Sequence, residues 1–301
     1  MTENFQSGFI AIIGRPNVGK STLINALIGQ KVAAVSPRAQ TTRRRQLGIL
    51  TTETYQMVFV DTPGLHSARH KLGELMNQEA REAFDDVDAV VWLVDATTDP
   101  SAEDAEIASM LPRRTLLVLG LNKLDLLTPE TLEARREAYQ ALVKREARVV
   151  PLSATRGDGL PDLLSLLVTF LPTRPAEFDE EQVTDLYEKE MAADLIREAA
   201  LLILRDEVPH GIAVRIDEFT ERDNGMAYIG ATVFVERESQ KGIVIGEGGK
   251  MLKRIGSAAR QQTESMGGRR VFLELRVKVL KDWRDDEEWL KRFGYKIKKR
   301  K

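Results

Sequence analysis

The stretch GRPNVGKST, residues 14–22, decides how the first part of this chain folds. Gly14 and Gly19 stand five positions apart and precede Lys20 and Ser21, which is the G-x-x-x-x-G-K-[ST] spacing of a phosphate-binding loop. In such a loop the glycines let backbone N–H groups approach phosphate oxygens, the lysine reaches the β and γ oxygens, and the serine hydroxyl is a ligand for Mg²⁺. The residues expected to contact the phosphates are Gly14, Arg15, Pro16, Asn17, Val18, Gly19, Lys20, Ser21 and Thr22.

The surroundings of the loop predict the fold class. Apolar runs alternate with helix-length amphipathic segments, such as STLINALIG directly after the loop, up to about residue 171. The expected strands cover residues 9–14, 55–62, 88–96, 115–123 and 148–154. Their nearly continuous apolar character is typical of a parallel sheet covered by helices on both faces. We therefore expect a doubly wound, mostly parallel α/β domain, in which ligands bind beyond the carboxyl ends of the strands.

The motif DTPG, residues 61–64, ends one of these strands. A carboxylate beside a phosphate loop can hold Mg²⁺ through water, so Asp61 is the expected metal partner of Ser21. The N–H of Gly64 can meet a γ-phosphate oxygen and sense its loss. The expected contacts from this motif are Asp61, Thr62, Pro63 and Gly64.

The motif NKLD, residues 122–125, indicates which base is bound. The Asp125 carboxylate can accept from both N1–H and the 2-amino group of guanine, whereas adenine would leave it buried and unpaired. The motif SAT, residues 153–155, can present a backbone N–H to guanine O6. The ligand is therefore predicted to be GTP or GDP with Mg²⁺, not ATP, and the expected base contacts are Asn122, Lys123, Asp125, Ser153 and Ala154.

The polar segment AQTTRRR, residues 39–45, is the expected nucleotide-sensing loop. Such a loop needs a threonine that meets Mg²⁺ when the γ-phosphate is bound; we expect Thr42, with Thr41 as the alternative. Ras-like GTPases carry a glutamine directly after the DTxG glycine, but here that position is Leu65, which cannot orient water. His66 and His70 lie nearby, although histidines on surface loops are more often solvated than catalytic. We therefore predict slow intrinsic hydrolysis, with Lys20, Thr42 and Gly64 as the catalytic contributors.

The composition indicates two soluble domains. The chain has 301 residues, no cysteine, no signal-peptide pattern and no apolar run long enough to span a bilayer, so we expect a cytoplasmic location. Residues 241–301 contain 18 Lys and Arg but 8 Asp and Glu, a net charge of +10, whereas residues 1–240 carry −12. A basic end on an acidic body suggests that the C-terminal region binds a polyanion.

The proline-containing segment LPTRPAEFDEEQ, residues 171–182, is read as a connection between the domains. We expect a first domain over 1–172, a linker over 173–183 and a second domain over 184–301. The second domain shows a helix, two alternating strands, a glycine loop, a long helix over about 249–266 and a final strand. This order predicts an α+β module with its own small core.

The stretch GIVIGEGGKMLKRIG, residues 242–256, contains a G-x-x-G loop that opens a helix. K-homology (KH) domains use such a loop to clamp a single-stranded nucleic-acid backbone, and the element order is that of the second KH topology. Ile243 and Ile245 are expected either in the groove floor or in the core, and Trp283 and Trp289 either stack on bases or pack the terminal segment. The expected RNA contacts are Lys241, Ile243, Ile245, Gly246, Glu247, Gly248, Gly249, Lys250, Lys253 and Arg254.

The motifs GRPNVGKS, QTTR, DTPG, NKLD and SA, followed by a KH module, resemble those of the Era family of bacterial ribosome-assembly GTPases over nearly the whole chain. The resemblance implies a monomeric cytoplasmic GTPase that associates peripherally with the inner membrane. It also implies that the KH module binds the 3′ end of 16S ribosomal RNA during maturation of the 30S subunit. Related GTPases replace the glutamine by an apolar residue, as Leu65 does. Some bind K⁺ through an asparagine that matches Asn17, so the resemblance implies Asn17 as a further catalytic contributor.

The leading interpretation is a switch in which GTP orders residues of about 38–46 and 62–72 and so changes RNA binding. Other interpretations stay open. The alternative is a GTP-regulated protein of anionic membrane surfaces that binds RNA without sequence preference. A GTPase directed to tRNA or the large subunit, or an RNA-binding protein with a decayed GTPase site, fits the KH module and the intact motifs less well.

Overall fold

The computed structural model describes residues 4–36, 38, 41–65, 68, 70–205, 208, 211–222 and 225–297. The chain forms two compact units. Unit 1 comprises Met1–Ala33, Thr42–Ser67 and Met76–Asp185, and unit 2 comprises Ala34–Thr41, Ala68–Leu75 and Leu186–Lys301. Two short segments from the N-terminal half of the sequence thus belong to the C-terminal unit, which a single boundary near residue 172 did not anticipate.

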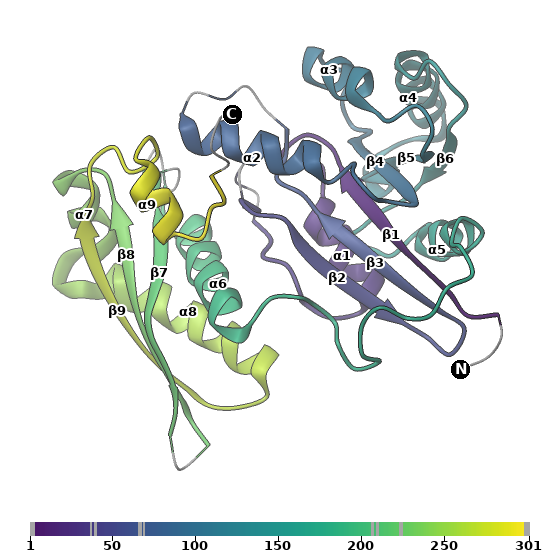
Figure 1. The fold of residues 1–301 in the computed structure, drawn as a ribbon. Coiled ribbons are helices and arrows are strands. Elements are labelled where there is room, and N and C mark those ends of the chain that lie inside the picture. The colour runs from purple at the N-terminus through teal and green to yellow at the C-terminus, as the bar shows by residue number, and fades with distance from the viewer. Residues whose placement is uncertain are drawn as a thin grey trace. The chain divides into compact units, whose positions relative to one another are not determined.

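Unit 1 is built on a six-stranded sheet with the strand order β2-β3-β1-β4-β5-β6 (Figure 1). The strands are β1 (Gln6–Ile13), β2 (Gln46–Thr51), β3 (Tyr55–Asp61), β4 (Ala89–Asp95), β5 (Leu116–Asn122) and β6 (Arg148–Pro151). β2 pairs antiparallel with β3, and the other neighbours pair in parallel. The mostly parallel sheet is as predicted, but β2 was not, because its short sequence QLGILT holds a glycine and lies at the sheet edge.

Helices cover both faces of this sheet. They are α1 (Lys20–Ile28), α2 (Lys71–Glu82), α3 (Ala102–Met110), α4 (Pro129–Leu142) and α5 (Leu160–Val168). Successive side chains of a strand point to opposite faces. Ile12 accordingly packs in one core cluster with Leu23 of α1 and Leu163 of α5, whereas Ile13 packs in another with Ile107 of α3. The nucleotide motifs lie at the carboxyl ends of β1, β3, β5 and β6, where a doubly wound sheet binds its ligand.

The segment expected as the linker, residues 173–183, packs along unit 1. The N–H of Ile49 in edge strand β2 donates to the Val183 oxygen at 2.9 Å, and Arg174 Nε donates to the Ser7 oxygen at 2.9 Å. The N–H of Leu47 donates to the Asp185 carboxylate at 2.7 Å. The bonds from Leu47 and Ile49 satisfy backbone groups of the sheet edge, and the bond from Arg174 reaches β1, so the segment is an ordered strap and unit 1 ends at Asp185.

Unit 2 contains a three-stranded sheet with the order β7-β8-β9, in which β7 and β8 are antiparallel and β8 and β9 parallel (Figure 1). Its elements are α6 (Glu188–Ile203), β7 (Ala213–Glu221), β8 (Ala227–Val235), α7 (Glu238–Ile245), η3 (Glu247–Gly249), α8 (Lys250–Gly267), β9 (Val271–Val279) and α9 (Glu287–Arg292). Ile196 of α6, Val233 of β8 and Ile255 of α8 meet in its core. Up to β9 the helices and strands follow the order α-β-β-α-α-β, which is the second KH topology that the sequence predicted.

The C-terminal aromatic residues pack against this unit. Trp283 is fully buried, and its Nε1 donates to the Gly211 oxygen at 2.9 Å. Trp289 lies against Phe234, with ring centroids 5.6 Å apart, and against Phe293. Of the two expectations, packing of the terminal segment is the one observed. Among the described residues, no helix combines the length and apolar character that crossing a membrane requires.

Candidate functional site

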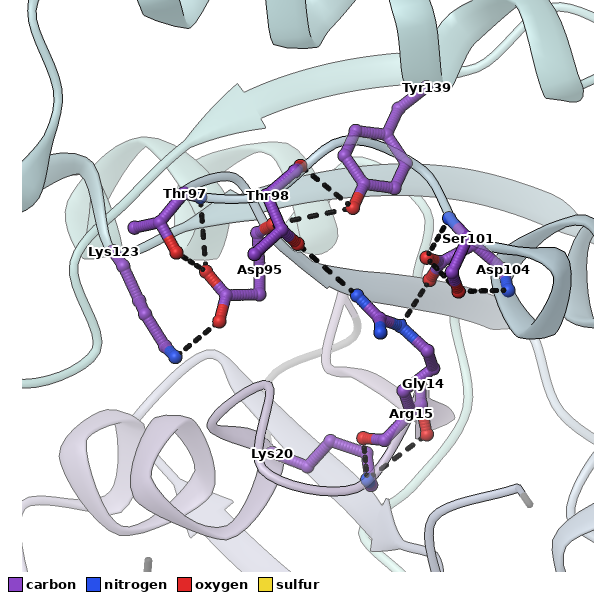
Figure 2. Close-up of polar contacts among 10 residues, drawn as sticks. All are labelled: Gly14, Arg15, Lys20, Asp95, Thr97, Thr98, Ser101, Asp104, Lys123 and Tyr139. Carbon is purple, nitrogen blue, oxygen red and sulfur yellow. Dashed lines mark hydrogen bonds and ion pairs between the residues drawn. The ribbon is translucent and has the colours of Figure 1, made fainter. Parts of the chain in front are cut away.

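The phosphate loop runs from the end of β1 into α1. Glycine is required at position 19 by close packing, because a Cβ there would lie 2.4 Å from Asn122 Nδ2. Lys20 Nζ donates to the main-chain oxygens of Gly14 at 3.1 Å and Arg15 at 2.9 Å, so the ammonium is held inside its own loop (Figure 2).

Lys20 of this loop and Asp61 at the end of β3 are both buried, and their charges interact. Burial lowers the pKa of Lys20 to about 8, although the charge of Asp61 acts in the opposite direction. Burial also raises the pKa of Asp61, against the charge of Lys20 and hydrogen bonds from Ser21, Thr42 and Gln46. Each charged form is therefore held at an energetic cost, which an anionic ligand beside Lys20 and a cation beside Asp61 would offset.

Three oxygen-bearing side chains meet beside the loop. Ser21 Oγ donates to Asp61 Oδ2 at 2.8 Å and lies 2.9 Å from Thr42 Oγ1, which donates to the same Asp61 oxygen at 3.1 Å. Asp61 Oδ1 is buried and has no hydrogen-bond partner among the described residues. Oxygen ligands suit Mg²⁺, so this cluster fits the predicted metal. The Thr41 hydroxyl instead donates to the Arg38 oxygen within unit 2, so the geometry favours Thr42.

The DTPG segment is fixed against the phosphate loop. Thr62 Oγ1 donates to the Ile12 oxygen at 2.9 Å. A Cβ on Gly64 would lie 2.6 Å from the Pro16 nitrogen, so this close approach requires glycine.

Leu65, at the position of the glutamine in Ras-like proteins, is 5% exposed and packs in the core cluster with Ile13 and Trp92. Its burial agrees with the prediction that it does not orient water. His70 lies 3.1 Å from an Asp285 oxygen within unit 2, and His66 lies outside the described residues, as do residues 39 and 40 of the expected sensing loop.

The guanine motifs are joined to the phosphate loop by Asn122. Its Nδ2 donates to the Val18 oxygen at 2.7 Å, and its Oδ1 accepts from the Ala154 N–H at 3.0 Å. Ser153 Oγ donates to Asp125 Oδ1 at 2.6 Å and so orients the carboxylate expected to read the base. The structure thus brings the predicted base contacts together.

Two predicted nucleotide contacts have side chains that are engaged elsewhere. Arg15 Nε donates to Asp104 Oδ1 at 2.9 Å, and Lys123 pairs with Asp95 (Figure 2). Sequence reasoning missed Asp95 and Asp104 because no nucleotide motif contains them.

A groove of about 510 Å³ lies between α8 and β9 in unit 2. The G-x-x-G loop forms a turn between α7 and α8, with positive φ at Gly246, Gly248 and Gly249. The residues that line the groove are Gly249, Leu252, Lys253, Gly256, Ser257 and Arg260 from the loop and α8, with Val271, Phe272, Leu273, Glu274 and Leu275 from β9. An apolar floor with cationic side chains beside a glycine loop suits a single-stranded nucleic acid.

Comparison with known proteins identifies the family. Residues 9–123 match the family described as 50S ribosome-binding GTPase, and residues 207–284 match the KH domain. The chain is 44% identical over 297 residues to GTPase Era of Ruminiclostridium cellulolyticum, covering 98% of this chain and 99% of that protein. It is also 44% identical over 294 residues to GTPase Era of Halothermothrix orenii, covering 97% and 99%. The chain belongs to the Era family of GTPases.

Solved Era structures share the fold of this chain. One is Era in complex with MgGDPNP and nucleotides 1506–1542 of 16S ribosomal RNA, with a TM-score of 0.90 and 36% identity over 97% of this chain and all of that one. Another is a variant of Aquifex aeolicus Era bound to GDP and AlF4⁻, with a TM-score of 0.93 and 36% identity over the same shares. The predicted GTPase domain followed by a KH domain is therefore confirmed.

The residues predicted as RNA contacts in this Era-family chain lie in different places relative to the groove. Ile243 and Ile245 are not among the residues that line it, and Ile243 is 49% exposed. The segment 238–245 is the helix α7, and of its consecutive residues Ile243, Val244 and Ile245 only Val244 is buried in the core. The β9 half of the groove was missed, since alternating strand residues carry no binding signature. Of the basic residues predicted as RNA contacts, Lys253 lines the groove, whereas Lys241, Lys250 and Arg254 do not.

Proposed function

We propose that this Era-family chain is a GTP-driven switch that binds the 3′ end of 16S ribosomal RNA and assists assembly of the 30S subunit. The observation that carries the proposal is that one chain holds both a complete set of guanine-nucleotide motifs and a cationic KH groove. The solved Era complex that matches 97% of this chain contains MgGDPNP and nucleotides 1506–1542 of 16S ribosomal RNA.

For the nucleotide reaction, Ser21, Thr42 and Asp61 would hold Mg²⁺, which supplies positive charge to the β and γ phosphates. Lys20 places its ammonium against the same oxygens, and the Gly64 N–H donates to the γ-phosphate. Because Leu65 lies in the core, the chain places no glutamine beside the attacking water at this position. The intrinsic hydrolysis of GTP to GDP and phosphate is therefore slow, and a partner or a bound K⁺ near Asn17 would accelerate it.

For RNA, the glycine loop lets the backbone of a single strand approach the start of α8, while bases lie on the apolar floor between α8 and β9. Lys253 and Arg260, both exposed at the groove, neutralise phosphates. We place this activity in the cytoplasm, and propose separately that the chain associates peripherally with the inner membrane, which binding to anionic vesicles tests.

The test is a titration of the full chain, loaded with GDPNP or with GDP, against a short RNA that copies the 16S 3′ end. A scrambled RNA of equal length is the control, and both are measured at two salt concentrations. We expect the GDPNP form to bind the authentic sequence at least about tenfold more tightly than the scramble, or about 1.4 kcal/mol, and more tightly than the GDP form does.

Binding that follows salt alone, with no preference for sequence or nucleotide, would refute the switch and indicate a general polyanion surface. A Lys253→Ala and Arg260→Ala double variant separates the sources of binding. Loss of RNA binding with retained vesicle binding would show that any membrane contact uses another surface.

A further inference from the structure

The segment from the end of β4 to the first turn of α3, residues 95–104, touches both nucleotide-binding loops of unit 1, although it contains no nucleotide motif. Two of its carboxylates, Asp95 and Asp104, are each paired with a cation from a different nucleotide-binding loop (Figure 2). We call residues 95–104 the brace. Its role below rests on the proposed GTP-binding function and extends it to residues that no motif assigns.

At its far end, the brace holds the phosphate loop. Asp104 is fully buried, and its Oδ1 accepts from Arg15 Nε at 2.9 Å, while the Arg15 side chain is 20% exposed. Arg15 Nη2 also reaches Thr98 Oγ1 at 3.4 Å. Burial alone would lower the pKa of Arg15, but the charge and hydrogen bond of Asp104 outweigh it and raise the pKa. The main-chain oxygen of Arg15 accepts a hydrogen bond from the Lys20 ammonium, so Arg15 links Asp104 to the lysine expected to bind phosphate.

At its near end, the brace holds the guanine loop. Asp95 Oδ2 accepts from Lys123 Nζ, and Asp95 Oδ1 accepts from the N–H and hydroxyl of Thr97 at 3.0 and 2.6 Å. Burial would raise the pKa of Asp95, but the bonds from Lys123 and Thr97 outweigh it and lower the pKa. Lys123 has a positive φ of 70°, an unusual backbone conformation for a non-glycine residue, two positions before Asp125.

Further hydrogen bonds hold the brace between these two ends. Tyr139 of α4 is fully buried, and its hydroxyl lies within hydrogen-bonding distance of two main-chain oxygens, those of Asp95 at 3.3 Å and Thr98 at 3.4 Å. Asp104 Oδ2 accepts from the N–H and hydroxyl of Ser101 at 2.9 and 2.8 Å, which caps α3. The Asp104 carboxylate thus caps the first turn of α3 and also pairs with Arg15 of the phosphate loop.

The geometry points to Asp95 and Asp104 as positioning residues that fix the guanine loop and the phosphate loop relative to each other. A guanine nucleotide is held at its base by one loop and at its phosphates by the other. If the spacing of the loops is set before binding, less conformational freedom is lost when the nucleotide binds. Asp104 acts through Arg15 and Asp95 acts through Lys123, so neither touches the ligand.

The test compares two ligands in four full-length proteins: wild type, Asp104→Asn, Asp95→Asn and Ser101→Ala. Fluorescent GDP reports a ligand that contacts both loops, and pyrophosphate, measured by competition, reports one that contacts the phosphate loop only. We expect Asp104→Asn to weaken both ligands about tenfold, and Asp95→Asn to weaken GDP about tenfold while pyrophosphate changes less than about twofold. Ser101→Ala, which removes the hydroxyl of the cap and keeps the Arg15 pair, lowers the unfolding temperature but leaves both affinities unchanged.

A double-mutant cycle completes the test. An Arg15→Gln variant should weaken GDP as Asp104→Asn does, and combining the two should add no further loss, because Asp104 acts through Arg15. In the Asp95→Asn, Asp104→Asn and Arg15→Gln variants the KM for GTP rises while kcat stays within about threefold, and Ser101→Ala changes neither.

Unchanged GDP affinity in both aspartate variants, additive losses in the cycle, or an equal loss in Ser101→Ala would overturn the inference. A wild-type chain that binds no GDP would instead refute the proposed function. Should Asp104→Asn fail to fold, the ligand comparison with Asp95→Asn still decides the guanine-loop half.

Discussion

Raising the pH above about 8 should weaken guanine-nucleotide binding through Lys20. The free protein holds this side chain buried, with its pKa lowered from 10.5 to about 8. The phosphates of a nucleotide bind the charged ammonium, so the bound state has the higher pKa. Binding to the protein above pH 8 must therefore take up a proton. Affinity is full below the lowered pKa and declines as the pH rises through it.

The size of the effect follows from the same values. A pKa lowered from 10.5 to about 8 means that the charged ammonium costs roughly 3 kcal/mol more, relative to the neutral amine, in the free site than in water. One pH unit above the lowered pKa, about one lysine in ten is charged, so the dissociation constant should rise about tenfold, or about 1.4 kcal/mol. Near pH 8, binding should take up about half a proton per nucleotide.

Calorimetric titration with GDP in buffers of different ionisation enthalpy measures both quantities. The matched control is Lys20→Arg, whose guanidinium stays charged over the whole range, so its weaker binding should show no such proton uptake. Any pH dependence that arises from the guanine base is present in both proteins, so the difference between their affinities reports Lys20 alone. A wild-type affinity that stays flat between about pH 7 and about pH 9, without proton uptake, would refute the assignment of a buried, easily deprotonated Lys20.

Four further outcomes are expected. Leu65→Gln should leave the GTP hydrolysis rate unchanged and lower stability by about 1–3 kcal/mol, since the position is buried; faster hydrolysis would show that the side chain reaches the nucleotide. Gly64→Ala should slow hydrolysis about tenfold in single-turnover assays with little change in GDP affinity, because its Cβ meets the phosphate loop. Lys253→Ala should weaken RNA binding and reduce the salt slope by about 1, and Arg254→Ala, outside the groove, should do so less. Hydrolysis should run faster in K⁺ than in Na⁺, and equal rates would contradict a K⁺ site at Asn17.

The parts of the fold that could be predicted from the sequence are those with a short-range signature. A continuous apolar strand in a parallel sheet is recognisable by itself. The bounds of β4 and β5 differ by one residue from the expected ranges 88–96 and 115–123, and β1 begins three residues before the expected residue 9. The edge strand β2 and the strap to Asp185 have no such signature. They are stabilised by pairing with each other, as in the bond from Ile49 to Val183, and this pairing joins segments more than a hundred residues apart.

The candidate site divides in the same way. Lys20, Asp61 and Asp125 are found by motif because their chemistry depends on neighbours at fixed offsets in the chain. Thr42 could be separated from Thr41 only by geometry, since both threonines suit the motif and only one hydroxyl reaches Ser21 and Asp61.

The brace marks the limit of local patterns most clearly. In the sequence, Ser101 and Asp104 form an ordinary capping box, and a cap accounts for both residues without any role in ligand binding. The second bond of Asp104 goes to Arg15, 89 positions earlier, and only the packed fold brings the two together. A carboxylate that already has a local explanation is easily passed over as a functional residue. Yet one oxygen of Asp104 caps α3 and the other pairs with Arg15 of the phosphate loop, so this carboxylate couples the stability of α3 to the geometry of the phosphate site. Substitutions at Asp104 should therefore move both properties, whereas those at Ser101 should move stability alone.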